Sequence, residues 1–175
     1  MRWIYIILMA LAATLMQTTA AQVLWLPTGV GWVGPIVPAA AGVFVGLYAR
    51  SAVDAALAGW LLGFCLELPL GGATIGLLSL LFAAGCAGLL AVREAFFRDR
   101  LLTQAVLGLL FCMAVYEAWA IFDAFIPGGS GHLGRASLQV LAASAYTAVL
   151  TPLVCALLKP LQRAMWTMPS MARRR

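Results

Sequence analysis

Long apolar runs, separated by short polar or glycine- and proline-containing breaks, make up most of the chain. A helix that spans a membrane needs roughly 17 to 25 apolar residues. Six runs come close to this length, and we expect a helix in each: 3–26, 32–49, 53–68, 73–92, 101–126 and 137–158. The pattern predicts an all-α fold, a polytopic membrane helix bundle of about six transmembrane helices in a single integral membrane domain over 1–175.

The breaks between these runs carry residues that end helices or remain in water. Glycine and proline follow the first and third runs, and a short polar turn, 50–54, follows the second. The fourth break, 93–100, is charged, and the fifth, 127–135, is rich in glycine. None of these breaks is long enough for a soluble domain.

The composition agrees with lipid as the main solvent of the chain. Apolar residues make up 64% of the 175 positions, charged residues make up 10%, and the mean hydropathy is +1.00. A membrane β-barrel would need short segments that alternate between apolar and polar residues. The runs here are unbroken, so helices are the expected solution.

The basic residues predict the orientation of the helices. Lys and Arg accumulate in short cytoplasmic loops. If the N-terminus is cytoplasmic, only Arg135 of the 11 basic residues lies outside. The other ten lie on the cytoplasmic side: Arg2, Arg50, Arg93, Arg98, Arg100, Lys159, Arg163, Arg173, Arg174 and Arg175. This bias predicts that both ends are cytoplasmic and favours six spans over five.

Two further features have a functional and a plainer interpretation. The net charge of +5 could suggest nucleic-acid binding, but the preference of basic residues for cytoplasmic loops explains it better. The basic tail 173–175 either contacts anionic lipid headgroups or only reflects this preference. The first run resembles a signal peptide, with Thr18, Thr19 and Ala20 before a possible cleavage site. Because the run continues to Leu26 and is long enough to span, we expect it to be retained.

Two acids within the apolar runs are candidate functional residues, because an ionisable group inside a membrane is costly. Glu67 lies near the outer end of the third run, and Glu117 lies deep in the fifth. Glu67 either caps the turn before Pro69 and Gly71 or contacts a partner or ligand. Glu117 either contacts another helix or a partner, or is hydrogen-bonded within its own bundle.

The sequence predicts no catalytic residues, no metal site and no cofactor. The single histidine, His132, lies in the glycine-rich break, without a nucleophile beside it. The four cysteines lack CxxC spacing and are expected to be packing residues: Cys65, Cys86, Cys112 and Cys155. Small residues four apart are expected to pack helices within the molecule rather than bind a partner: Gly42 with Gly46, Gly59 with Gly63, Gly72 with Gly76, and Ala84 with Gly88.

Several segments together resemble the rod shape-determining protein MreD family, over about residues 30 to 165. They are Pro38 to Tyr48, the glycine-rich stretch from Gly59 to Glu67, and Gly71 to Gly76. Gln104 at the start of the fifth run, Glu117, and the last run with Pro152 and its basic exit at Lys159 are similar to the family as well. The chain departs from the family in having Glu67 where an aspartate is usual and in its glycine-rich 127–135 loop.

The resemblance implies a non-enzymatic scaffold of the cell-elongation machinery in the bacterial inner membrane. Its partners would be an MreC-like periplasmic protein and the peptidoglycan-synthesis complex of a transpeptidase and a glycosyltransferase. Glu67, Glu117, Gln104 and Pro152 are then candidates for partner contact or for structural support. The main alternative is the substrate-binding membrane subunit of a vitamin-type energy-coupling transporter, and an intramembrane enzyme is a weaker third possibility.

Overall fold

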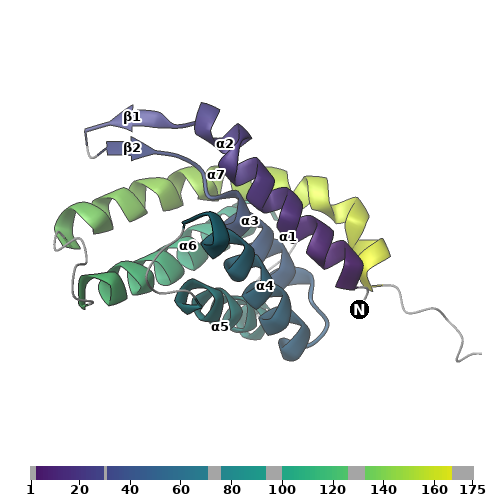
Figure 1. Cartoon of the computed structure of the whole chain (residues 1–175). Helices are drawn as coiled ribbons and strands as arrows, with labels where there is room; N and C mark the ends of the chain where they lie inside the picture. Colours follow the sequence, from purple (N-terminus) through teal and green to yellow (C-terminus); the bar gives the residue numbers. More distant parts are fainter. Residues whose placement is uncertain (1–2, 30, 71–75, 94–99, 126–132, 167–175) are drawn as a thin grey trace, which may run out of the picture.

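The fold is a helix bundle with a small two-stranded hairpin at its edge (Figure 1). The computed structural model describes residues 3–29, 31–70, 76–93, 100–125 and 133–166. In chain order the elements are α1 (Trp3–Thr18), α2 (Ala20–Val23), β1 (Leu26–Thr28), β2 (Gly31–Val33), α3 (Val37–Tyr48), α4 (Ala52–Leu70), α5 (Leu77–Val92), α6 (Leu101–Phe125) and α7 (Leu133–Trp166).

Four helical segments among the described residues are long and apolar enough to cross a membrane. They are Trp3–Val23, which joins α1 and α2, Ala52–Pro69 in α4, Leu101–Phe125 in α6, and Ala136–Pro160 in α7. The predicted apolar helices of spanning length are therefore confirmed at four of the six places. At the other two, the helices are shorter than expected: α3 has 12 residues and α5 has 16.

The predicted helix 32–49 is wrong at its start, and the chain is not entirely α-helical. Residues 31–33 form β2, which pairs antiparallel with β1, and α3 begins only at Val37. Pro35 and Pro38 explain the late start, because proline lacks an N–H and fits a helix only in its first turn, where Pro38 stands. The same hairpin replaces the end of the first predicted helix, since α2 ends at Val23.

The other predicted helix boundaries lie closer to the observed ones. Helix α5 starts at Leu77 because Gly76 has φ +104°, a left-handed conformation that favours glycine and ends regular helix on its N-terminal side. Positions 73–75 of that predicted helix lie outside the described residues. Helix α7 extends past 137–158 at both ends, so Arg135 belongs to a helix rather than to a loop. Residues 127–132 of the predicted loop, which include His132, lie outside the described residues.

Helix α3 forms the centre of the bundle (Figure 1). Every residue from Pro38 to Tyr48 is buried. The surrounding core includes an edge-to-face pair of rings, Phe82 from α5 and Phe111 from α6, with centroids 5.4 Å apart. A helix buried on all sides is apolar all round, as the residues of α3 are.

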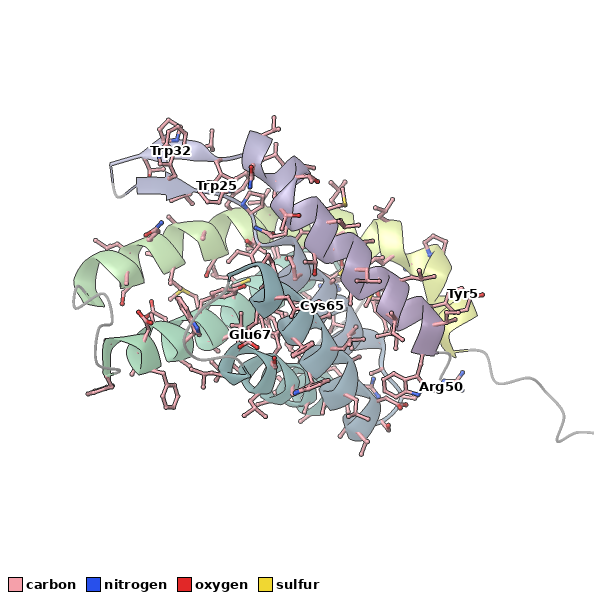
Figure 2. The ribbon with its side chains drawn as sticks, viewed as in Figure 1. Tyr5, Trp25, Trp32, Arg50, Cys65 and Glu67 are labelled. Carbon is pink, nitrogen blue, oxygen red and sulfur yellow. The ribbon has the colours of Figure 1, made fainter. Side chains whose placement is uncertain are left out.

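The bundle has two distinct ends (Figure 1). At one end, α1 begins and α7 ends, and the turn between α3 and α4, with Arg50, lies there too (Figures 1 and 2). Arg93 belongs to the same end, because it contacts the carbonyl of Ala49. We call this the basic end. The hairpin and the facing ends of α6 and α7 lie at the opposite end, which we call the hairpin end.

Candidate functional site

The Glu67 carboxylate joins the end of α4 to the start of α5 (Figure 2). Its Oε2 accepts hydrogen bonds from the Gly76 N–H at 2.8 Å and the Ser79 hydroxyl at 2.7 Å, and its Oε1 accepts one from the Leu78 N–H at 2.6 Å. The backbone donors belong to the first turn of α5, where no partner exists within the helix. Glu67, which is 7% exposed, therefore caps α5. The helix dipole also favours a negative charge at this N-terminus.

Small residues on α4 bring Glu67 to this position. Ala55, Gly59, Gly63 and Glu67 are four residues apart and so lie along one face of the helix. A Cβ on Gly63 would lie 2.6 Å from the Ser79 Cα, and one on Gly59 would lie 2.6 Å from a backbone oxygen of α5. The two backbones are in contact at both glycines. The expected intramolecular packing role is therefore confirmed for this pair.

The other small-residue pairs behave differently from one another. A Cβ on Gly46 would lie 2.7 Å from the Leu89 Cβ, so α3 packs closely on α5 there. Gly42 similarly faces Phe111 of α6. Ala84 and Gly88 are exposed instead, with open space around Gly88, so intramolecular packing was the wrong prediction for this pair. Gly76 precedes α5, and Gly72 lies outside the described residues.

The start of α3 is capped by side chains from two other helices. The Thr147 hydroxyl oxygen on α7 accepts a hydrogen bond from the Ile36 N–H at 2.9 Å. The Gln17 side-chain oxygen on α1 accepts one from the Val37 N–H at 2.8 Å. These contacts satisfy donors that would otherwise be orphaned inside an apolar bundle, where an unpaired backbone group costs several kcal/mol.

The end of α3 is capped by a cation. Arg93, at the C-terminus of α5, donates from Nη1 to the carbonyl of Ala49 and, at 3.5 Å, to that of Leu47. These carbonyls belong to the last turn of α3 and the residue after it, where a positive charge is favoured by the helix dipole. Helix α3 is therefore held at both ends, by α1 and α7 at its start and by α5 at its end.

Glu117 links α6 to α7. Its Oε2 accepts a hydrogen bond of 3.0 Å from the Ser137 hydroxyl, near the start of α7. The side chain is half-buried. This contact is of the intramolecular kind expected for Glu117, and a contact with a partner stays a prediction. Glu67 and Glu117 bond to different helices, so their described contacts do not pair the two acids.

Gln104 and Pro152 belong to the contact between α6 and α7 closer to the basic end. Gln104 is buried and lies one turn before Gly108, where a Cβ would meet the Thr151 hydroxyl at 2.5 Å. Thr151 directly precedes Pro152, and its hydroxyl donates to the Thr147 carbonyl one turn earlier at 2.8 Å. Pro152 itself has no N–H to offer to α7. Both candidates thus lie beside a close contact between α6 and α7, at Gly108 and Thr151.

Sequence reasoning did not single out Gln17, Ser79, Arg93, Ser137 or Thr147. Each is a polar residue in or beside an apolar run, and this property was the available signal. Their partners are up to 111 positions away along the chain, so spacing alone does not reveal them.

Nothing in the described residues groups three or more His, Cys, Asp or Glu side chains into a possible metal site. The four cysteines are free and buried in the bundle. The Cys86 thiol donates to the Gly42 carbonyl at 3.4 Å, between α5 and α3. The cysteines therefore contribute packing, as their positions in apolar runs predict.

An open hollow lies beside the hairpin. It has a volume of about 380 Å³ and is lined by Gln22, Trp25 and Trp32. Trp25 packs on the backbone of Gly34, where a Cβ would collide with its ring. Of the two rings that line the hollow, Trp25 packs against the backbone and Trp32 is the more exposed. No protein-family model, curated protein or solved structure matches this chain.

Proposed function

We propose that this chain is a non-enzymatic membrane scaffold of the bacterial cell-elongation machinery, which regulates cell shape by binding partner membrane proteins. The observation that carries the proposal is the use of polar side chains within the bundle, two of them buried (Glu67 and Thr147) and two half-buried (Gln17 and Arg93), each of which satisfies a helix terminus. This use fits a rigid bundle whose outer faces are apolar helices, as a protein that binds others within lipid requires.

The proposed scaffold crosses the inner membrane six times, with the basic end in the cytoplasm. Helix α3 is only about 18 Å long, against a hydrocarbon core of about 30 Å. The strand β2 and the three residues before α3 would complete the second crossing. Arg50 and Arg93 lie at the basic end, which the positive-inside rule assigns to the cytoplasm.

The resemblance to the MreD family supports the choice of partners. The proposed partners are an MreC-like periplasmic protein and the wall-synthesis complex of a transpeptidase and a glycosyltransferase. Large apolar side chains are exposed along α1, α6 and α7, among them Leu11, Leu110 and Leu153. These faces are available for lipid and for partner helices.

Co-purification from intact membranes tests the proposal. A tagged chain is expected to retain a single-span periplasmic partner and wall-synthesis enzymes, identified by mass spectrometry. Retention of an ATPase pair without any wall-synthesis protein would overturn the proposal and favour the transporter.

Glu117 offers a sharper test in cells. An amide oxygen at this position can still accept the Ser137 hydrogen bond, whereas an aliphatic side chain cannot. Glu117→Leu is therefore expected to impair rod shape more than Glu117→Gln, at matched amounts of protein in the membrane. Ser137→Ala is the matched variant on the other side of the bond. Equal defects in the Leu and Gln variants would contradict a hydrogen-bonding role.

The second candidate, a substrate-binding subunit of a vitamin-type transporter, is favoured by one observation. The hollow beside Gln22, Trp25 and Trp32 opens at the hairpin end, which would face outward. An amide and two indole rings can orient a small aromatic ligand. Thermal unfolding with a panel of water-soluble vitamins tests this candidate, because a bound ligand raises the melting temperature in a concentration-dependent way.

A further inference from the structure

The outer surface of the hairpin is apolar. Large side chains are exposed on and just before it: Val23 (86%), Leu24 (46%), Trp25 (43%), Leu26 (55%) and Trp32 (60%). Figure 2 shows Trp32 at the outer side of the hairpin, away from the helices. In water, such a surface would be an exposed patch that soluble proteins avoid.

Charge separates this hairpin from an ordinary surface loop. No Asp, Glu, Lys, Arg or His stands anywhere between positions 3 and 49. Large apolar residues are exposed on α1 as well, among them Leu8, Leu11 and Leu15. The candidate span and the hairpin that follows it therefore both present apolar side chains in a stretch of chain without charge.

The edges of the hairpin are closed to a further strand. Trp32 pairs with Pro27, and the Trp32 carbonyl accepts a hydrogen bond of 3.1 Å from the Gln139 side chain on α7. The backbone groups of this pair therefore point outward from the hairpin, and on the β1 side Pro27 has no N–H to present. An edge without a donor does not template strand addition. The hairpin is therefore poorly suited to bind an extended peptide as an added strand.

The contact with α7 also fixes how deep the hairpin lies. Gln139 is three residues inside the candidate span that begins at Ala136, so Trp32 lies near one end of the apolar segment. Tryptophan favours this boundary between hydrocarbon and headgroups, because its ring is apolar and its N–H is polar.

We propose that the hairpin is a lipid-binding element, which inserts Trp32, Trp25 and Leu26 into the headgroup boundary of the outer leaflet. This inference rests on the membrane orientation given under the proposed function. The occupant of this face is a lipid surface, rather than water or a protein.

Tryptophan fluorescence in vesicles of zwitterionic and anionic phospholipid tests the inference. The chain has six tryptophans, so a variant that keeps only Trp32 is reconstituted with lipids brominated high or low on their acyl chains. Trp32 is expected to lose more fluorescence with the shallow bromines than with the deep ones, and to be protected from aqueous acrylamide. A second comparison, between the unmodified chain and Trp32→Phe, gives the Trp32 contribution without multiple substitutions.

A variant that keeps only Trp60 is the control for membrane embedding. Trp60 is 42% exposed and lies within the candidate span of α4. Quenching of Trp60 by the lipids without quenching of Trp32 overturns the lipid-binding hairpin but leaves the membrane bundle intact. Free access of acrylamide to Trp32, or shielding of Trp32 from both quenchers by a protein, overturns it too. If the brominated lipids quench neither Trp32 nor Trp60, the membrane-embedded bundle itself is contradicted.

Discussion

Single polar residues in this chain act mainly on helix ends. Gln17, Glu67, Arg93 and Thr147 reach termini of helices other than their own. Hydrogen bonds that involve a charged group contribute about 1.5 to 3 kcal/mol each, more than neutral ones. In an apolar bundle these few contacts satisfy backbone groups at both ends of α3 and at the start of α5.

The cap of α5 predicts graded effects at Glu67. Glu67→Leu removes the acceptor of three hydrogen bonds and is expected to destabilise the protein by roughly 3 kcal/mol or more. Glu67→Gln keeps one side-chain oxygen and is expected to cost less. Thermal unfolding in detergent, followed by circular dichroism, measures both variants.

Ser79→Ala is the matched control, because it removes only one of the three hydrogen bonds. Its expected cost is about 1.5 kcal/mol, the lower end of the range for a hydrogen bond to a charged group. If Glu67→Leu proved as stable as Ser79→Ala, the capping role would be contradicted. A loss of partner binding in Glu67→Gln without any loss of stability would instead favour direct contact with a partner.

Glu67 could be singled out from the sequence, but its exact partners could not. A carboxyl group near the end of an apolar run is conspicuous, and a capping role was one of its two interpretations. Which donors it meets depends on the contact between α4 and α5 and on the turn at Gly76. Gln17 and Thr147 are less conspicuous, because neutral polar residues are common in membrane helices and their shared partner segment is apolar.

At the scale of elements, α4 and α5 form the closest helix pair around Glu67. The glycines at 59 and 63 let α4 touch backbone atoms of α5. Helices in lipid gain stability from such contacts, since no hydrophobic effect drives them together. The exposed Gly88 on α5 makes no comparable contact.

A Cβ added at Gly63 would collide with the backbone at Ser79, at 2.6 Å. Gly63→Ala is therefore expected to destabilise the protein by about 1 to 3 kcal/mol, the usual cost of overpacking. Gly88→Ala has open space and is expected to be neutral or stabilising by up to about 1 kcal/mol, because alanine favours helix. Chemical denaturation of both variants measures the difference, and equal stability would contradict the close packing of α4 on α5.

The elements themselves were predictable to different degrees. The ranges of α4 and α6 follow from apolar runs bounded by polar turns. The hairpin was missed because Leu26 and Trp32 are as apolar as their helical neighbours, and hydropathy does not register backbone conformation. The short length of α3 could have been inferred from Pro35 and Pro38, which restrict where a helix can start.

At the scale of the whole molecule, a buried 12-residue helix is surrounded by longer ones. The basic end and the hairpin end give the bundle a clear polarity (Figure 1). The apolar character of the whole followed from composition, whereas the central position of α3 did not. That position depends on contacts between residues distant in sequence, such as the one between Ile36 and Thr147.

The polarity of the bundle predicts which positions are accessible from each side of the membrane. Ala52 and Gly29 are exposed, at the basic and hairpin ends respectively. A membrane-impermeant maleimide is expected to label Ala52→Cys only after the cytoplasmic side is opened, and Gly29→Cys in intact cells. Position 98, outside the described residues, is expected to behave as Ala52 does.

The native cysteines of the unmodified chain are buried and provide the background for this labelling. Labelling of both new cysteines from the same side would contradict the orientation and the six crossings. It would leave the contacts within the bundle unaffected.

The capping of α3 has a consequence for biogenesis. Gln17 is synthesised before α3, but Thr147 follows Ile36 by 111 positions. If the chain is inserted into a membrane as proposed, the Ile36 N–H lacks its final acceptor until α7 has been synthesised and inserted. Arrival of α7 completes the core, so a nascent chain that stops short of it presents an unfinished segment to the proteases that survey the bilayer.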